Sequence, residues 1–415
     1  MSIQVHFNDI NLSVISISRP KLWIFANSIV QLLYDSIGDE EQHRDSSGSS
    51  EDNTDRDDDD DDDEDVDEDE TTSGIKDIGV HFAKLSTDFN GSSRKPVDNS
   101  SKPQSHPHSA KFPSIEGQEE APEDYFFHVA LTPTECTIVC STNLSLRFFD
   151  QPLKMCQELD YTDVEILPQQ YLSLIVDSDG GYDRSSRILE LTKPLSENDI
   201  SLLYISSHFN DIVLIPSELK ERVERILISK HFVFSESSNS FISTYDMDKQ
   251  EQPALSELHK KTFELLARED IHPQIHEKNK VLLTGARPGE IKYCILKTIK
   301  LISLASTLQP SYFAITRTFS NELSLILPKS HKLRSKYGYK STSTIGSSQD
   351  VLVPIAMDLS KLPLNCTGVV AGLANKLIIT GGNVLEIGYL SMAKSGIILI
   401  PNEDLDLARN TLSEL

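Results

Sequence analysis

The sequence predicts an α+β fold made of four tandem modules in two duplicated pairs, and three observations carry this prediction. Residues 200–216 (ISLLYISSHFNDIVLIP) match residues 385–401 (LEIGYLSMAKSGIILIP) at a constant offset of 185 positions. At an offset of 268 positions, VISISRP at 14–20 matches LLTGARP at 282–288, and an amphipathic helix follows in both copies. Pairs of short strands also alternate with single helices along the chain. Internal repetition of this length indicates duplication of whole modules.

The repeating unit is a strand, a helix, two consecutive strands and a further helix. Two consecutive strands with no helix between them exclude a doubly wound parallel sheet, in which a helix must connect every pair of strands. The order is typical of a ferredoxin-like sandwich, in which an antiparallel sheet carries helices on one face. We therefore expect four tandem ferredoxin-like modules.

The first and third modules begin with an apolar run that ends in Arg-Pro. The helix after Pro20 has apolar residues at Phe25, Ile29 and Leu33, the spacing of one helical face, and proline is favoured in a first turn. The third-module helix repeats this stripe at Ile295 and later positions. Runs of β-branched and aromatic residues separated by turn residues predict two strands after each helix. These strands are expected at 125–131 and 137–141, and at 312–316 and 323–327.

The second and fourth modules show the unit in full. Strands at 171–176 and 350–357 lead into the helices RILELTKPLSE and TGVVAGLANKL. After the repeated strand pair, Pro216 and Pro401 each precede an acidic helix start with a capping residue, which favours a last helix. The expected modules are 1–37 with 125–160, then 161–245, 277–345 and 346–415, with a linker at 246–276.

Residues 38–124 are predicted to form a long disordered acidic insertion in the first module. Ser, Asp, Glu, Pro, Asn and Gly dominate this stretch, so it buries too little apolar surface to offset the entropy of ordering the chain. Within it, residues 51–70 alone carry a charge of −15, out of −25 for the whole chain. The remainder of the chain is therefore only mildly acidic.

Composition excludes several classes of function. A net negative charge argues against nucleic-acid binding, because it repels phosphate backbones. No window approaches 18 uninterrupted apolar residues, so no membrane span is expected. The five cysteines contain no C-x-x-C pair, which favours a reducing compartment and hence a cytoplasmic protein.

Motifs of catalysis are missing from the sequence. It contains no G-x-x-x-x-G-K-[ST], G-x-S-x-G or H-E-x-x-H pattern, so we expect a protein that is not an enzyme and uses no cofactor. His272 and His276 have a spacing seen in metal sites, but Pro273 disfavours a continuous helix there and no Cys or third His lies nearby in sequence. No metal site is therefore expected.

The segment TGVVAGLANKL, with Gly368 at the helix start and Val370 and Leu373 inside, resembles the strand-to-helix signature of ACT domains. The blocks VISISRPKLWIFANSIVQLLY, EDYFFHVALTPTECTIV and PLSENDISLLYISSHFNDIVLIPSELKERVERIL resemble the CASTOR family of tandem ACT-domain proteins. Outside the acidic insertion, the resemblance covers nearly the whole chain. That family is similar to the regulatory halves of aspartate kinases.

The resemblance implies a function. The family senses arginine in the cytosol by binding it between the second and fourth ACT modules, and this changes how the protein docks on a GATOR complex that controls the target-of-rapamycin kinase. By resemblance we expect a non-enzymatic, amino-acid-binding regulator in nutrient signalling, with a free amino acid and a GATOR-type complex as partners. ACT sheets often pair edge to edge, so a homodimer is also expected.

The resemblance also implies which residues line the ligand site. A helix N-terminus that begins with glycine lets backbone N–H groups approach a carboxylate, while side chains of the facing module contact the rest of the ligand. The implied residues are Asn198, Ser201 and Leu202 in the second module, Cys366, Thr367, Gly368, Val369 and Val370 in the fourth, and Met392, Ala393 and Gly396 at the far end.

Two positions depart from the family's pattern. Gly396 stands where the family has an acid that pairs with the guanidinium, and Cys366 stands where it has a second acid near the amine. A buried guanidinium that lacks a charged hydrogen-bond partner costs on the order of 1.5–3 kcal/mol or more. Two alternatives follow: either the site binds a smaller or less charged amino acid than arginine, or the chain is a ligand-free ACT scaffold that has lost the site.

Overall fold

The segment that precedes the acidic stretch contacts the segment that follows it. Tyr125 Oη donates a hydrogen bond to the backbone oxygen of Leu32 (3.0 Å) and lies 3.2 Å from Asp35 Oδ2. Apart from Gly38, the predicted disordered insertion lies outside the described residues. The computed structural model describes residues 4–38, 125–176, 184–234, 253–304, 310–379 and 386–413.

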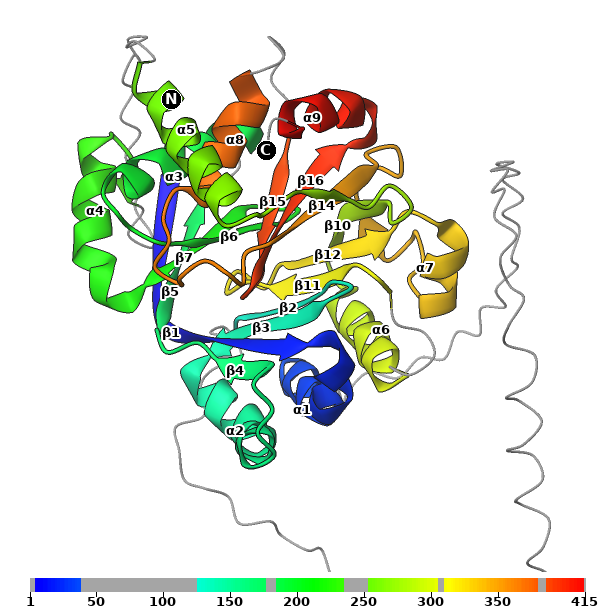
Figure 1. Cartoon of the computed structure of the whole chain (residues 1–415). Helices are drawn as coiled ribbons and strands as arrows, with labels where there is room; N and C mark the ends of the chain where they lie inside the picture. Colours follow the sequence, from blue (N-terminus) through cyan, green and yellow to red (C-terminus); the bar gives the residue numbers. More distant parts are fainter. Residues whose placement is uncertain are drawn as a thin grey trace, which may run out of the picture. The chain divides into compact units, whose positions relative to one another are not determined.

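Four stretches of the chain repeat the order strand, helix, strand, strand, helix (Figure 1). The first stretch contains β1 (Gln4–Ser18), α1 (Leu22–Asp35), β2 (Phe127–Leu131), β3 (Glu135–Ser141) and α2 (Thr142–Glu158). The second contains β5 (Tyr171–Val176), α3 (Arg184–Glu197), β6 (Leu203–Ser206), β7 (Asp211–Pro216) and α4 (Lys220–Ser229). The third contains β10 (Val281–Ala286), α6 (Ile291–Ser303), β11 (Phe313–Arg317), β12 (Leu323–Pro328) and α7 (His331–Tyr337). The fourth contains β14 (Leu352–Asp358), α8 (Val369–Ile379), β15 (Gly388–Ser391), β16 (Ser395–Pro401) and α9 (Leu405–Leu412).

Shorter elements connect these stretches. The short strands are β4 (Val164–Ile166), β8 (Val233–Phe234), β9 (Gln274–Ile275) and β13 (Thr344–Ile345). The helix α5 (Pro253–Arg268) lies within the predicted linker, and single 3-10 turns η1 (Arg19–Lys21), η4 (Ser217–Leu219) and η5 (Asn402–Asp404) precede three of the helices. Whether the four predicted modules are separate domains with the predicted boundaries stays a prediction.

All four stretches have the same antiparallel strand order. The last strand of each stretch lies between the first two, so the orders are β1-β3-β2, β5-β7-β6, β10-β12-β11 and β14-β16-β15. The short strands β4, β13 and β9 lie beside the first strands of stretches one, three and four, and the start of β1 takes this place beside β5. This is the strand order of the ferredoxin-like sandwich.

The four stretches join into one closed ring of strands. β2 pairs with β11, β6 pairs with β15, β1 pairs with β5, and β10 meets β14 at a single residue pair. The pairings β1–β5 and β10–β14 join stretches within each half of the chain, and β2–β11 and β6–β15 join the two halves to each other. Each half therefore occupies a continuous part of the ring.

The two faces of the strands bury different side chains. Ile15 and Ile17 of β1 contact a cluster that includes helices α1 and α6, whereas Leu12 and Val14 of the same strand contact a cluster built from strands and their turns. This separation follows from the alternation of side chains along a strand. Helices α3, α5, α8 and α9 therefore cover one side of the ring and α1, α2 and α6 the other, as Figure 1 shows.

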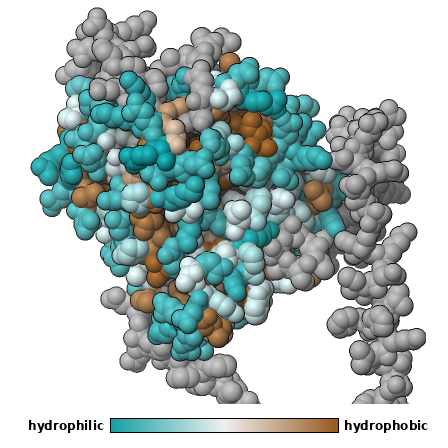
Figure 2. All heavy atoms as spheres, in the orientation of Figure 1, coloured by the Kyte–Doolittle hydropathy of each residue, from teal (hydrophilic) through white to brown (hydrophobic). Residues whose placement is uncertain are grey.

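The helix α1 turns one apolar face outward. Trp23 and Tyr34 are 69% and 67% exposed. Leu22 and Phe25 occupy the inward face instead, and a residue next to them on a helix points about 100° away. Elsewhere the surface in Figure 2 is mostly hydrophilic, with small hydrophobic areas between.

The pairing of β2 with β11 buries a histidine. His128 is fully buried opposite Thr316, and its Nδ1 lies 2.8 Å from Thr316 Oγ1. Burial disfavours the charged imidazolium and lowers the pKa of His128 to about 3. This ring is therefore neutral at physiological pH.

We expect His128 to make the protein less stable as the pH falls from about 6.5 towards 3. In this window the unfolded chain binds a proton at this residue and the folded chain does not, so the free energy of unfolding decreases by up to about 1.4 kcal/mol per pH unit. Urea unfolding of the full chain and of His128→Asn between pH 7 and 4 measures this contribution. Equal pH dependence in the two proteins would contradict it.

Candidate functional site

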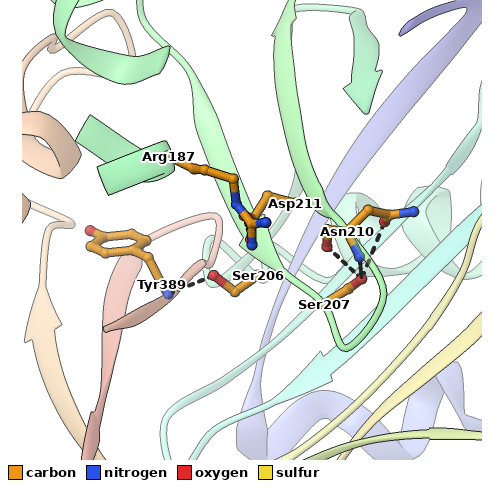
Figure 3. A network of polar contacts seen from close by, with 6 residues as sticks. All are labelled: Arg187, Ser206, Ser207, Asn210, Asp211 and Tyr389. Atoms are coloured by element: carbon orange, nitrogen blue, oxygen red, sulfur yellow. Dashed lines mark hydrogen bonds and ion pairs between the residues drawn. The ribbon is translucent and has the colours of Figure 1, made fainter. Parts of the chain in front are cut away.

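Strands β6 and β15 belong to the two copies of the longer repeat, and they pair edge to edge. The backbone N–H of Tyr204 donates to Ser391 Oγ (2.8 Å). In return, the N–H of Tyr389 donates to Ser206 Oγ (3.0 Å), as Figure 3 shows. These bonds are reciprocal, since the repeat aligns the two tyrosines and the two serines with each other. Each serine hydroxyl satisfies a buried N–H at the junction.

The first turn of α8 has a fixed position above this junction. Gly368, just before the helix, has φ of +87°, a conformation that favours glycine. Its carbonyl oxygen accepts from Thr262 Oγ1 (3.0 Å) and from the N–H of Gly372 (2.7 Å). A side chain on Gly372 would overlap Thr262, so α5 and α8 pack very closely.

The loop between α3 and β6 is also well anchored. Asn198 Nδ2 donates to the oxygen of Pro194 (2.8 Å), and Arg222 donates to the oxygen of Asn198 (2.7 Å). Asp199 turns the chain with φ of +53°. The half-buried Ser201 that follows makes no hydrogen bond to the part of the chain that the structure describes, so its hydroxyl can donate to a ligand.

Four of the predicted site residues come together. Leu202, Cys366, Val369 and Val370 contact the same hydrophobic cluster between the sheet and helices α3 and α8. Thr367 and Gly368 are half-buried beside them. Burial raises the pKa of the Cys366 thiol, which therefore stays uncharged.

The far end of the predicted site does not form as expected. Met392 and Ala393 lie in the cluster inside the ring, on the face of the sheet opposite Val369 and Val370. Successive residues of β15 point to alternate faces, and the turn that follows carries Met392 inward. Met392 and Ala393 therefore cannot share one pocket with α8.

Gly396 faces the helices, but a tyrosine fills the space beside it. A Cβ atom on Gly396 would overlap Tyr389 Oη and would lie 3.4 Å from Leu359 Cδ1. Tyr389 is 1% exposed, and burial raises the pKa of its hydroxyl, so the phenol stays neutral. A neutral hydroxyl thus occupies the space beside Gly396.

The repeat-related position carries the acid instead. Asp211 aligns with Gly396 in the longer repeat. Its Oδ2 lies 3.4 Å from Arg187 Nη2 of α3, and the side chains are 1% and 8% exposed (Figure 3). This ion pair was not predicted from the sequence. The signal for it was an aspartate at the start of an apolar run, aligned with a glycine in the other copy of the repeat.

Two segments of the chain match the family model of the ACT domain, at 166–229 and 347–414. Together they cover about a third of the chain, and they contain β6 and β15 respectively. The chain is therefore an ACT-domain protein in these two regions, and its two matched regions are the ones that pair edge to edge. A search of curated proteins finds no match.

Solved structures show only distant likeness. A protein from Agrobacterium tumefaciens is 15% identical over 28% of this chain and 92% of its own, with a TM-score of 0.20. A Vibrio cholerae protein of unknown function is 18% identical over 37% and 94%, with a TM-score of 0.24. The aspartate kinase from Synechocystis is 8% identical over 69% of this chain and 48% of its own, with a TM-score of 0.25. At such scores these likenesses assign no function.

Two other classes of site were considered. Among the described residues, no helix combines the length and the apolar character that crossing a membrane requires. The same residues contain no group of three or more His, Cys, Asp or Glu side chains placed to hold a metal ion.

We expect Asp211→Ala to destabilise the protein by about 3–5 kcal/mol, because it leaves the Arg187 charge buried without its carboxylate. The double variant Arg187→Met, Asp211→Leu should recover most of that loss, since it removes both charges. Urea unfolding measures the effect, with Asp406→Ala as an exposed acidic control. A loss below 1 kcal/mol in Asp211→Ala would contradict the role given to the ion pair.

Proposed function

We propose that this protein is a non-enzymatic regulator that binds a free amino acid between its two matched ACT regions. The reciprocal pairing of Tyr204 and Tyr389 with Ser391 and Ser206 carries this proposal, because it places the two regions edge to edge. A site at such a junction depends on both regions. Ligand binding there would change how the regions sit together, which is what a regulatory protein needs.

The proposed ligand lies between the first turn of α8 and the loop before β6. The N–H groups that follow Gly368 would bind the carboxylate, aided by the partial positive charge of the helix N-terminus. The Ser201 hydroxyl would contact the amine or carboxylate, and Leu202 and Val370 would contact the side chain. Tyr389 beside Gly396 favours a small or uncharged side chain over a guanidinium.

Further parts of the proposal rest on the resemblance to the CASTOR family. All four stretches would be ACT domains, since they share one strand order. The protein would act in the cytoplasm, in nutrient signalling through the target-of-rapamycin kinase, by docking on a GATOR-type complex. A homodimer is a further part of the proposal that rests on this resemblance alone.

A ligand-free ACT scaffold is the second candidate function. The filling of the space at Gly396 by Tyr389, together with the neutral Cys366, supports this alternative. Such a protein would keep the ACT architecture for docking and would respond to no amino acid. The two candidates therefore differ in whether any amino acid binds.

We expect one small or uncharged amino acid to bind the full chain, measured by isothermal titration against all twenty. Ser201→Trp should abolish binding, because the indole would fill the space between the loop and α8. Ser229→Trp, on the exposed end of α4, is the matched control and should bind normally. Binding should also stabilise the fold, by about 2.7 kcal/mol at a hundredfold excess over the dissociation constant.

Two outcomes would contradict the proposal. If none of the twenty amino acids binds, the scaffold alternative holds. If arginine binds most tightly, the inference from Gly396 and Tyr389 about ligand size and charge is wrong.

A further inference from the structure

A cavity of about 260 Å³ opens at one end of the ring of strands, away from α8. The β2–β3 turn, β9, β14 and the β15–β16 turn surround it. It belongs to the junction of the first and fourth stretches, whereas the proposed amino-acid site belongs to the second and fourth. The cavity is therefore a separate feature of the fold, and ends of closed sheets are frequent places for small-ligand sites.

Hydrogen bonds hold the two turns at the cavity together. The N–H of Ala393 donates to Thr137 Oγ1 (2.9 Å), and the N–H of Lys394 donates to Glu135 Oε2 (3.3 Å). The hydroxyl of Ser395 donates to the other oxygen of Glu135. Glu135 is only 6% exposed, so a buried carboxylate joins the wall of the cavity to the turn.

At the opposite end of the ring, side chains fill the equivalent space. There the β6–β7 turn meets β12 and the β11–β12 turn: the N–H of His208 donates to Ser324 Oγ (2.8 Å), and Asn210 donates to Glu322 (2.9 Å). The rings of His208 and Phe209 pack on Gly285 so closely that a Cβ there would lie 2.5 to 2.8 Å from them.

The repeat relates the two turns residue by residue. At the offset of 185, His208 and Phe209 correspond to Ala393 and Lys394. Two aromatic side chains at one end are thus replaced by a methyl group and a flexible chain at the other. The duplicated fold does not require the cavity, because one of its two ends packs without it.

The lining of the cavity is acidic. It contains Glu135, Asp163 and Asp358 against a single lysine, Lys394. Burial raises the pKa of Glu135, so a cation bound beside it would favour its ionised form. The ammonium of Lys394 lies 3.0 Å from Glu165, outside the lining, so its charge is already partnered. A net negative, partly buried pocket favours a cation and disfavours an anion.

The remaining polar groups of the lining are hydrogen-bonding groups without charge. Tyr312 Oη lies 2.7 Å from His276 Nδ1, and burial lowers the pKa of His276, so this ring is neutral near pH 7. Ser18 donates to Asp163. A carboxylate accepts about four hydrogen bonds, so Glu135, with two donors, keeps capacity for a ligand.

We propose that this cavity binds a small organic cation that carries an amine or guanidinium group, with its charged end against Glu135 and Asp163. Two or three donors on that group suit the free positions of the carboxylates and the neighbouring hydroxyls. The volume holds one ligand of a few carbon atoms. This second site lies at a junction that the proposed amino-acid site does not include, so either can exist without the other.

Putrescine and agmatine are the probes, titrated calorimetrically into the full chain at 0.15 M salt, with 1,4-butanediol as the neutral analogue of putrescine. We expect putrescine or agmatine to bind and butanediol not to bind. Glu135→Gln should weaken binding about tenfold or more, because it removes a charged hydrogen-bond partner. Glu322→Gln removes the same charge from the filled end of the ring and is the matched control, with no expected effect.

A second variant tests the cavity itself. Ala393→His with Lys394→Phe copies the filled end of the ring and should abolish cation binding, and unfolding by urea checks that the variant folds. The acidic segment 51–70 also attracts cations, but binding there would be equal in every variant. Absence of binding to the unaltered chain, or equal binding in Glu135→Gln, Glu322→Gln and the filled variant, would overturn the proposal.

The two proposed sites fail separately. Ser201→Trp should leave cation binding unchanged, and Glu135→Gln should leave the binding of the amino acid unchanged. Loss of putrescine and agmatine binding in Ser201→Trp would place the cation in the amino-acid site and would overturn the second site.

Discussion

The rest of the architecture depends on the path of β1. Its second half pairs with β3 and its first half pairs with β5, with a shift of register between Asn8 and Leu12. A strand that changes partner partway along its length must belong to two sheets at once, and an irregular register provides the bend. The sheets are thereby stacked face to face, and the side chains between them, such as Val14 and Ile326, form a core with no helix in it.

The joining of the two halves at their edges follows from this arrangement. Once β1 joins the first stretch to the second, the free edges β2 and β6 point towards the other half of the chain, where β11 and β15 complete them. Pairing the edges removes four rows of exposed backbone groups from solvent. The junctions between stretches, where the proposed ligand sites lie, are therefore part of the fold.

Duplication creates equivalent places, and side-chain differences make them unequal. Asp211 with Arg187 in one copy corresponds to Gly396 beside Tyr389 in the other, so one position has a buried ion pair and the other has a neutral phenol. The β6–β7 turn carries the aromatic residues His208 and Phe209, whereas the β15–β16 turn carries Ala393 and Lys394 at the corresponding positions. A duplicated protein can in this way keep one packed copy for stability while the other copy acquires a pocket.

The sequence by itself determined the element types, the strand pairs and the two repeats, because hydrophobic periodicity and turn residues act locally. Resemblance of the segment around Gly368 to the ACT signature also indicated an ACT domain there, and the structure gives Gly368 the left-handed φ that favours glycine. Cys136 and Cys140, four residues apart on β3, share one face of the strand, and both are fully buried.

Only the tertiary structure decided which edges meet and which faces become interior. The inward position of Met392 and the outward position of Trp23 depend on neighbours hundreds of positions away in sequence, such as Thr137 beside Ala393. The cavity beside Glu135 also depends on distant parts of the chain. It exists because Lys394 stands where the other copy has the aromatic ring of Phe209. Long-range pairing selects among registers and faces that local preferences leave equal, and it therefore determines the sites.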